Sequence, residues 1–118
     1  MAATGIFSEA RDAIATRITA LGLVPVSDPR NARPLTVFIE LPTFDSFTYN
    51  VGDVTFTLRV LAAPPGNLDS ADYLLTTIDT LMADQGLAIV SGQPTLAVIG
   101  GQELPAYDLT VRIAARRN

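Results

Sequence analysis

The sequence predicts an α+β fold in which two helices pack on one face of a mainly antiparallel sheet. Two segments repeat their apolar residues with the period of a helix, and the segments around the second one alternate apolar and polar residues as strands do. The resulting order is helix, strands, helix, strands. The sequence shows neither a repeat nor a linker, so residues 1–118 are expected to form a single domain with one core.

The first helix is expected over residues 6–21. Its apolar side chains fall on one stripe of a helical wheel: Phe7, Ala10, Ile14, Ile18 and Leu21. Thr4 or Ser8 can cap its first turn, and Gly22 suits the position just after its last turn. We therefore predict an amphipathic helix whose stripe faces the core.

Two strands are expected next. Residues 35–41 alternate, and Leu35, Val37, Ile39 and Leu41 share one side until Pro42 ends the pattern. Residues 53–62 alternate most clearly, with an apolar side made of Val54, Phe56, Leu58, Val60 and Ala62. The polar side of this strand consists of Asp53, Thr55, Thr57 and Arg59. We predict that this polar side, or an unpaired edge of the strand, meets a neighbouring subunit. Arg59→Glu is then expected to disturb the oligomer without unfolding the chain.

The connection between these strands, residues 43–52, is long for a hairpin and contains Phe44, Phe47 and Tyr49. Aromatic side chains in such a connection either fold back on the core or contact a partner, and both interpretations stay open. The same holds for Arg116 and Arg117, which either solubilise the end of the chain or pair with acidic neighbours. These five residues are therefore candidate contacts with a subunit or a partner.

The Pro-rich segment 63–67 ends the second strand, and a second helix is expected to follow it. Its predicted buried stripe is centred on Ile78 and closed by Gly86: Leu68, Ala71, Leu74, Leu75, Ile78, Leu81 and Met82. Two final strands are expected at residues 95–99 and 107–113, and Gly100 and Gly101 allow a tight turn between them.

The residue types that carry most enzyme chemistry are missing. The chain contains no cysteine, histidine, lysine or tryptophan, which removes thiolate, imidazole and amine chemistry and the soft ligands of zinc. Asp69, Asp72 and Asp79 share the outer face of the second helix, and a solvated face near the positive helix end explains them. We therefore expect a protein that is not an enzyme and that holds neither a cofactor nor a metal.

Composition also bears on partners and location. Hydrophobic residues make up 48% of the chain and charged residues only 17%, so part of the surface is expected to be buried in an assembly. The net charge of -4 disfavours binding to nucleic acid phosphates. Charged residues in the first helix, such as Arg11 and Asp12, disfavour a signal peptide or membrane span there. We expect a soluble protein made in the cytoplasm.

Several stretches together resemble one known family. An amphipathic helix opens the chain, a strand ends in Pro42, and D-V-T-F-T-L-R-V-L (residues 53–61), A-D-Y-L-L-T-T-I-D-T-L (71–81) and L-P-A-Y-D-L-T-V-R-I (104–113) follow. This order and these stretches resemble the tail terminator proteins of long-tailed (siphovirus) bacteriophages, especially those that infect actinobacteria. The resemblance covers nearly the whole chain.

The resemblance implies an α+β subunit of a homohexameric ring that caps the major tail tube protein, stops tube polymerisation and offers a docking surface to the head-tail connector. DNA would pass through the ring without specific binding, which an acidic wall favours. The protein would belong to the neck of a virion that is assembled in the host cytoplasm. The alternatives are a head-tail stopper or tail completion protein, a small dimeric ligand-binding or regulatory domain, and an enzyme that uses only carboxylates and arginine.

Overall fold

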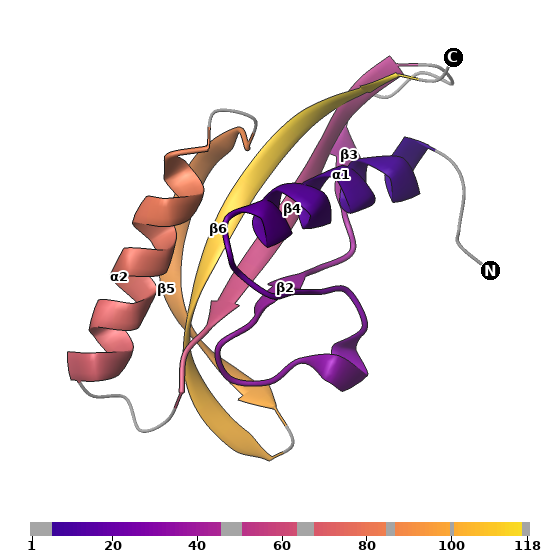
Figure 1. Ribbon diagram of the computed structural model, residues 1–118. Helices are drawn as coiled ribbons and strands as arrows, with labels where there is room; N and C mark the ends of the chain where they lie inside the picture. Colours follow the sequence, from indigo (N-terminus) through magenta and orange to yellow (C-terminus); the bar gives the residue numbers. More distant parts are fainter. Residues whose placement is uncertain (1–5, 46–50, 64–67, 85–86, 100, 117–118) are drawn as a thin grey trace.

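The computed structural model describes residues 6–45, 51–63, 68–84, 87–99 and 101–116, and the structural statements below concern these residues (Figure 1). Helices α1 (Ile6–Ala20) and α2 (Leu68–Met82) lie on one face of a six-stranded, mostly antiparallel sheet. The α+β fold predicted from the sequence is confirmed.

The sheet has the order β1-β2-β4-β6-β5, and β3 pairs with β4 beside β2. Its strands are β1 (Pro25–Val26), β2 (Val37–Ile39), β3 (Thr43–Asp45), β4 (Val51–Leu61), β5 (Ile89–Ile99) and β6 (Gln102–Arg116). A short 3-10 helix, η1 (Pro29–Asn31), lies between β1 and β2. The β1–β2 pair is parallel, and the other pairs of described strands are antiparallel. The two ends of the sheet are therefore the two-residue strand β1 and the eleven-residue strand β5.

The main core lies between the helices and the sheet. Ile14 and Ile18 of α1 are buried, and Phe7, Ala10 and Leu21 of the same stripe pack against them, as predicted. The apolar side of β4 is buried along its length, which confirms the alternation: Val54, Phe56, Leu58, Val60 and Ala62. A second, smaller cluster includes Leu61, Ala97 and Leu104.

Two local features of the first half follow the prediction only in part. Gly22 ends α1 with a φ of 83°, a conformation that glycine adopts readily. Ser8 lies inside α1 rather than at its start, and Thr4 lies outside the described residues. The strand predicted over residues 35–41 is shorter, because Leu35 has a φ of 67° and Leu41 is 89% exposed.

The connection predicted over residues 43–52 is shorter than expected. Residues Thr43–Asp45 form β3 and pair with β4, where Phe44 is opposite Val54. Val51 and Gly52 already belong to β4. Residues 46–50, which include Phe47 and Tyr49, lie outside the described residues. β3 and β4 are therefore consecutive antiparallel strands, and the pairing of β3 is shifted by one residue relative to that of β2, since Ile39 is opposite Leu58 whereas Phe44 is opposite Val54.

The final hairpin is much longer than the two short strands predicted. Both strands contain a proline, and each proline occupies a position that tolerates it. Pro94 lies in the edge strand β5, and Pro105 lies in β6 just beyond the end of β4, where its carbonyl accepts a hydrogen bond from Ala62 at 2.9 Å. The hairpin therefore extends past β4, and Gly101 turns its tip with a φ of 79°.

Helix α2 is rotated relative to the predicted stripe. Its buried residues are Ser70, Leu74, Thr77 and Leu81, whereas Leu68, Leu75 and Met82 are exposed and Ile78 is half-buried. Two polar residues occupy the buried side, and Ser70 Oγ is satisfied by donating to the Ala63 carbonyl at 2.7 Å. The predicted stripe is therefore wrong in its centre, because hydrophobicity alone assigned these polar positions to the outside.

The rotation of α2 predicts different costs for two leucines of the same helix. Leu81→Ala should lower the free energy of unfolding by about 2–5 kcal/mol, because Leu81 is fully buried. Leu75→Ala should change it by about 0.5 kcal/mol or less, because Leu75 is 58% exposed. Urea denaturation followed by circular dichroism measures both. Equal losses for the two variants would contradict the orientation of α2.

Candidate functional site

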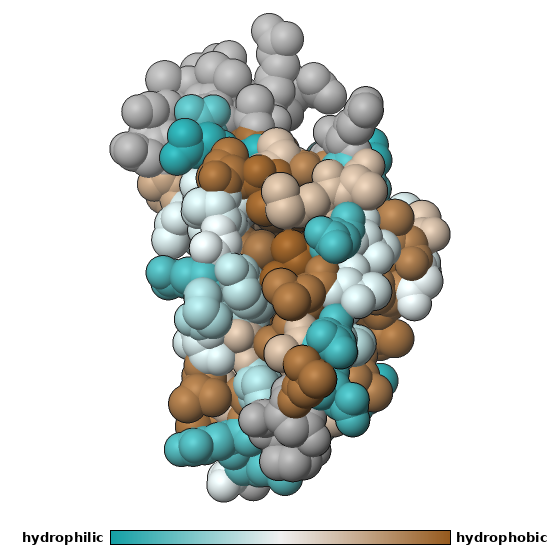
Figure 2. Space-filling view, turned by 90° about the vertical axis from the view of Figure 1, so that its left-hand side faces the viewer, coloured by the Kyte–Doolittle hydropathy of each residue, from teal (hydrophilic) through white to brown (hydrophobic). Residues whose placement is uncertain are grey.

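One side of the molecule exposes apolar residues from both α2 and β5. Six large apolar side chains there are each more than half exposed: Leu68, Leu75, Met82, Val90, Leu96 and Val98. We call these six residues the apolar face. Figure 2 views the molecule from the side that carries α2, and apolar residues gather along the middle of that side. Large contiguous patches of exposed apolar residues are typical of surfaces that contact another molecule.

Helix periodicity explains how α2 contributes to this face. Leu68, Leu75 and Met82 recur every seven residues and so lie on one line of the helix, beside the line that packs on the sheet. On β5, Leu96 and Val98 are opposite Pro105 and Glu103 of β6, near the tip of the hairpin and beyond the end of β4. No described residue of either helix buries them. The hairpin is thus longer than the layer of helices that covers it.

A shallow groove separates the second half of α2 from β5. It has a volume of about 170 Å³, and Ile78, Met82, Val90, Tyr107 and Leu109 are among its lining residues. Gly92 also lines it, and a β-carbon at this position would lie only 2.7 Å from Leu109 Cδ2. The groove floor is therefore closely packed, and its apolar rim is the part open to a partner.

The free edge of β5 is poorly suited to pair with another strand. Val90 sits at a register irregularity between Ile89 and Ser91, which marks a β-bulge. Pro94, near the middle of the strand, has no N–H to donate. Bulges and prolines protect natural edge strands from association through the backbone. Contact at this edge is therefore expected to use side chains.

The outer side of α2 is acidic. Asp69, Asp72 and Asp79 are exposed, as the sequence predicted, and α2 contains no basic residue. Asp72 follows Leu68 by four residues and Asp79 follows Leu75 by four, so these carboxylates border the apolar face. Within the described residues, no group of three or more acidic side chains is placed to hold a metal ion.

The polar side of β4 is engaged within the chain. Arg59 Nε donates to Asp108 Oδ1 at 2.8 Å, and Arg59 Nη2 lies 3.7 Å from Glu40 Oε1. The hydrogen bond to Asp108 raises the pKa of Arg59 further above its ordinary value, so Arg59 stays charged. Asp53 is exposed, and Thr55 and Thr57 are half-buried beside it on this side of the sheet.

These positions contradict the part of the prediction for β4 that concerns a free edge, whereas contact through its polar side stays a prediction. Both edges of β4 are paired, to β6 on one side and to β2 and β3 on the other, so no edge of this strand is free for a neighbour. The charge of Arg59 is already balanced by two carboxylates of the same chain. Arg59→Glu is therefore expected to destabilise the subunit itself, contrary to the expectation from the sequence.

The remaining candidate residues are placed unevenly. Phe44 is 63% exposed, and its ring centroid lies 5.5 Å from that of Phe7 on α1. The sequence left open whether Phe44 folds back on the core or contacts a partner. Part of its ring packs against Phe7, and the rest is exposed and accessible to a partner. The backbone of Arg116 belongs to β6, and its side chain lies outside what the structure describes, as does Arg117. Phe44 thus lies beside α1 and not at the apolar face.

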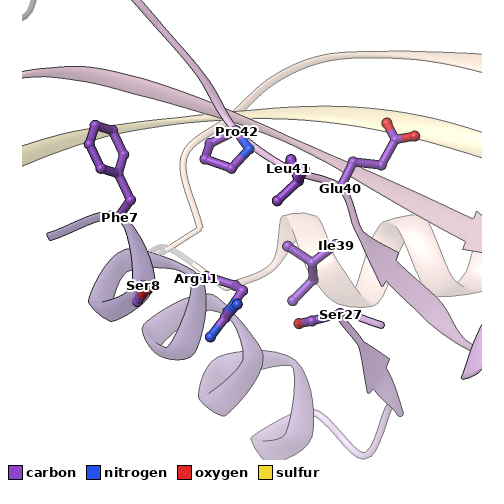
Figure 3. Close-up of a pocket in the computed structure, with 8 residues that line it drawn as sticks. All are labelled: Phe7, Ser8, Arg11, Ser27, Ile39, Glu40, Leu41 and Pro42. Carbon is purple, nitrogen blue, oxygen red and sulfur yellow. The ribbon is translucent and has the colours of Figure 1, made fainter. Parts of the chain in front are cut away.

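The described hollows are small. The one beside α1 has a volume of about 110 Å³ and lies between the helix and the segment after β2, as Figure 3 shows with Phe7, Arg11, Ile39 and Pro42. A polar hollow of about 250 Å³ lies on the sheet, lined by residues such as Thr57, Asp108 and Thr110. Ligand pockets usually measure roughly 300–1,000 Å³. A surface contact fits this molecule better than an enclosed ligand.

Two further findings complete the description. Among the described residues, no helix is both long and apolar enough to cross a membrane. The sequence matches no protein-family model and no curated protein. The functional assignment therefore depends on the surface of this chain and on the resemblance of its sequence stretches.

Sequence reasoning missed the apolar face because it assigned the three residues of α2 to the core and did not assign an exposed side to those of β5. Leu68, Leu75 and Met82 were expected to be buried, and Val90 was not placed in an element. A usable signal existed: the apolar positions of α2 span a wider arc than one sheet contact can cover. When the apolar arc of a helix is this wide, the sheet covers one part of it and the rest stays exposed.

The ion pair of Arg59 gives a direct test of the corrected assignment. Arg59→Glu would place three carboxylates together, with Glu40 and Asp108, and should lower the free energy of unfolding by about 1–3 kcal/mol. The matched variant Arg59→Glu/Asp108→Arg restores an opposite pair and should regain part of this loss. Urea denaturation measures both variants. An unchanged midpoint for Arg59→Glu alone would show that the ion pair contributes nothing.

Proposed function

We propose that the protein is a tail terminator, a subunit of a ring that caps the tail tube of a long-tailed bacteriophage, stops its polymerisation and provides a docking surface for the head connector. The observation that carries the proposal is the apolar face on α2 and β5. An apolar surface of this extent is costly on a protein that works alone, and it is typical of a subunit that is buried in an assembly. The resemblance of the sequence stretches supplies the kind of assembly.

The other properties of the chain support an assembly role. Charged residues make up only 17% of the sequence, and its described hollows are smaller than ligand pockets usually are. The net charge of -4 suits a passage through which DNA moves without adhering. The partners of the proposed ring are further copies of the chain, the major tail tube protein and the connector or stopper protein.

A neck protein of another type is the second candidate. A head-tail stopper or completion protein would need the same kind of apolar contact surface, and the difference lies in where it acts. A dimeric ligand-binding domain is less favoured, because the groove beside β5 holds only about 170 Å³. The three functions predict different phage particles after the gene is deleted, so an experiment can distinguish them.

Deletion of the gene from the phage provides the test. Without a cap the tube has no stop, so we expect tails of irregular and excessive length that lack heads. Electron microscopy of the lysate measures tail length, and supplying the wild-type chain from a plasmid should restore uniform tails. Tails of normal length that fail to join heads would indicate a stopper instead. Normal, infectious particles would contradict both neck functions.

A further inference from the structure

We propose that the apolar face of one subunit binds the opposite end of the sheet in a second copy of this chain, in a head-to-tail contact. We call that opposite end the β1 edge and define it by Val24, which precedes β1, and by Arg33 and Leu35 of the segment that leads into β2. In that segment the N–H of Leu35 donates to the Leu61 carbonyl of β4 at 2.9 Å. The inference rests on the proposed function in one respect, because a closed ring requires each subunit to bind the next through two different surfaces.

Hydrogen bonds of Thr36 and of its neighbour Val37 fix the backbone of the β1 edge. Thr36 Oγ1 donates to the Arg33 carbonyl at 2.6 Å, and the N–H of Val37 donates to the Val24 carbonyl at 2.9 Å. Leu35 adjoins Thr36 and adopts a φ of 67°, an unusual conformation for a leucine. This conformation accompanies a leucine that is half exposed rather than buried. The edge thus presents two apolar side chains and one arginine on a fixed backbone.

The two surfaces lie at opposite ends of the sheet. The strand order begins at β1 and ends at β5, and Figure 1 shows η1 on the side of the molecule away from α2. A contact between opposite ends joins subunits in one direction. Repetition of such a contact generates a ring when the rotation between subunits closes.

Charge complementarity selects this pairing. Among the described residues, most arginines are engaged by carboxylates of their own chain: Arg11 with Asp12, Arg17 with Asp84, Arg30 with Asp28, and Arg59 with Asp108 and Glu40. Of the arginines whose side chains the structure describes, only Arg33 and Arg112 have no ion pair, and only Arg33 lies at the β1 edge. Its guanidinium donates to the Asn31 carbonyl, which leaves its charge unbalanced.

The apolar face carries the opposite charge. Asp72 and Asp79 border it, and α2 has no cation to balance them. Two copies that met through the same face would bring these carboxylates together, which disfavours a two-fold dimer. A copy that presents Arg33 beside Val24 and Leu35 instead matches the face in both charge and apolar character. Strand addition at β5 is disfavoured by the bulge at Val90 and by Pro94.

Charge reversal at each surface tests the contact. Asp79→Arg places a cation beside Leu75 on the face, and Arg33→Glu places an anion on the β1 edge. Each variant alone should weaken self-association by about tenfold or more, because its contacts become like-charged. Matched controls are Glu9→Arg and Arg112→Glu, which make the same charge changes at exposed residues that belong to neither surface. Sedimentation over a range of protein concentrations measures the association.

Mixing the two variants distinguishes a head-to-tail contact from others. In an alternating ring, the face of the Asp79→Arg variant meets the β1 edge of the Arg33→Glu variant, so the two substituted positions carry opposite charges. The next contact joins the unchanged Asp79 of one variant to the unchanged Arg33 of the other. An equimolar mixture should therefore regain the wild-type oligomer that neither variant forms alone. Rescue supports the inference, whereas variants that associate like the wild type, or a mixture without rescue, overturn it.

The absence of cysteine from the chain allows a second, geometric measurement. Leu75→Cys and Leu35→Cys are prepared separately, mixed, and treated with a short bis-maleimide. Cross-links should form between the two variants and not within either one alone. Cross-linking of Leu75→Cys with itself would show a two-fold contact and would overturn the inference.

The outcome separates this contact from the proposed function. If wild-type chain assembles but the charge variants assemble equally well, the contact is misassigned while a cap can still form through other surfaces. If the charge variants and the mixture behave as expected and gene deletion leaves tails normal, the contact stands and the tail terminator function fails. A wild-type chain that stays monomeric at all concentrations also overturns the contact.

Discussion

The pairing of β4 with β6 is the interaction on which the rest of the structure depends. The two strands are paired along the whole of β4, from Val51 opposite Arg116 to Leu61 opposite Ala106. Because successive side chains point to opposite faces, this register fixes both faces at once. It places Phe56 opposite Val111 on the covered face and Arg59 opposite Asp108 on the other. A slip of one residue would bury the arginine and expose the phenylalanine.

The lengths of the elements then determine what remains exposed. α1 and α2 each have fifteen residues and pack on the middle of the sheet, whereas β5 and β6 continue past the end of β4. Leu96 and Val98 are left exposed near the hairpin tip, and the rotation of α2 leaves Leu75 and Met82 exposed, with Met82 near Val90 at the other end of β5. The apolar face is thus a consequence of packing short helices on a longer hairpin.

The charges differ in how far they are balanced within the chain. Most arginines of the described part are paired within the chain, so they stabilise the subunit and do not form an open basic patch. The acidic residues of α2 stay unpaired beside apolar side chains. Such a surface rejects copies of itself and favours a partner with an exposed cation, which gives a contact its direction. Direction is what a closed ring requires of its subunits.

The sequence by itself determined the elements whose pattern is local. The alternation of β4 and the stripe of α1 could be read directly, because one buried face imposes a period of two or of 3.6 on neighbouring residues. The absence of histidine, cysteine and lysine likewise needed no structure. These features sufficed for the α+β class and for the expectation of an assembly role.

Only the tertiary structure decided the features that depend on distant residues. Pro94 and Pro105 are acceptable in strands because of where β4 and the sheet edge lie. Ser70 can be buried because the Ala63 carbonyl accepts its hydrogen bond, which sets the rotation of α2 and so exposes Leu75. Arg59 is unavailable to a neighbour because Asp108, forty-nine residues away, lies opposite it. In each case the residue that determines the outcome lies outside the local sequence pattern, so the pattern alone does not predict it.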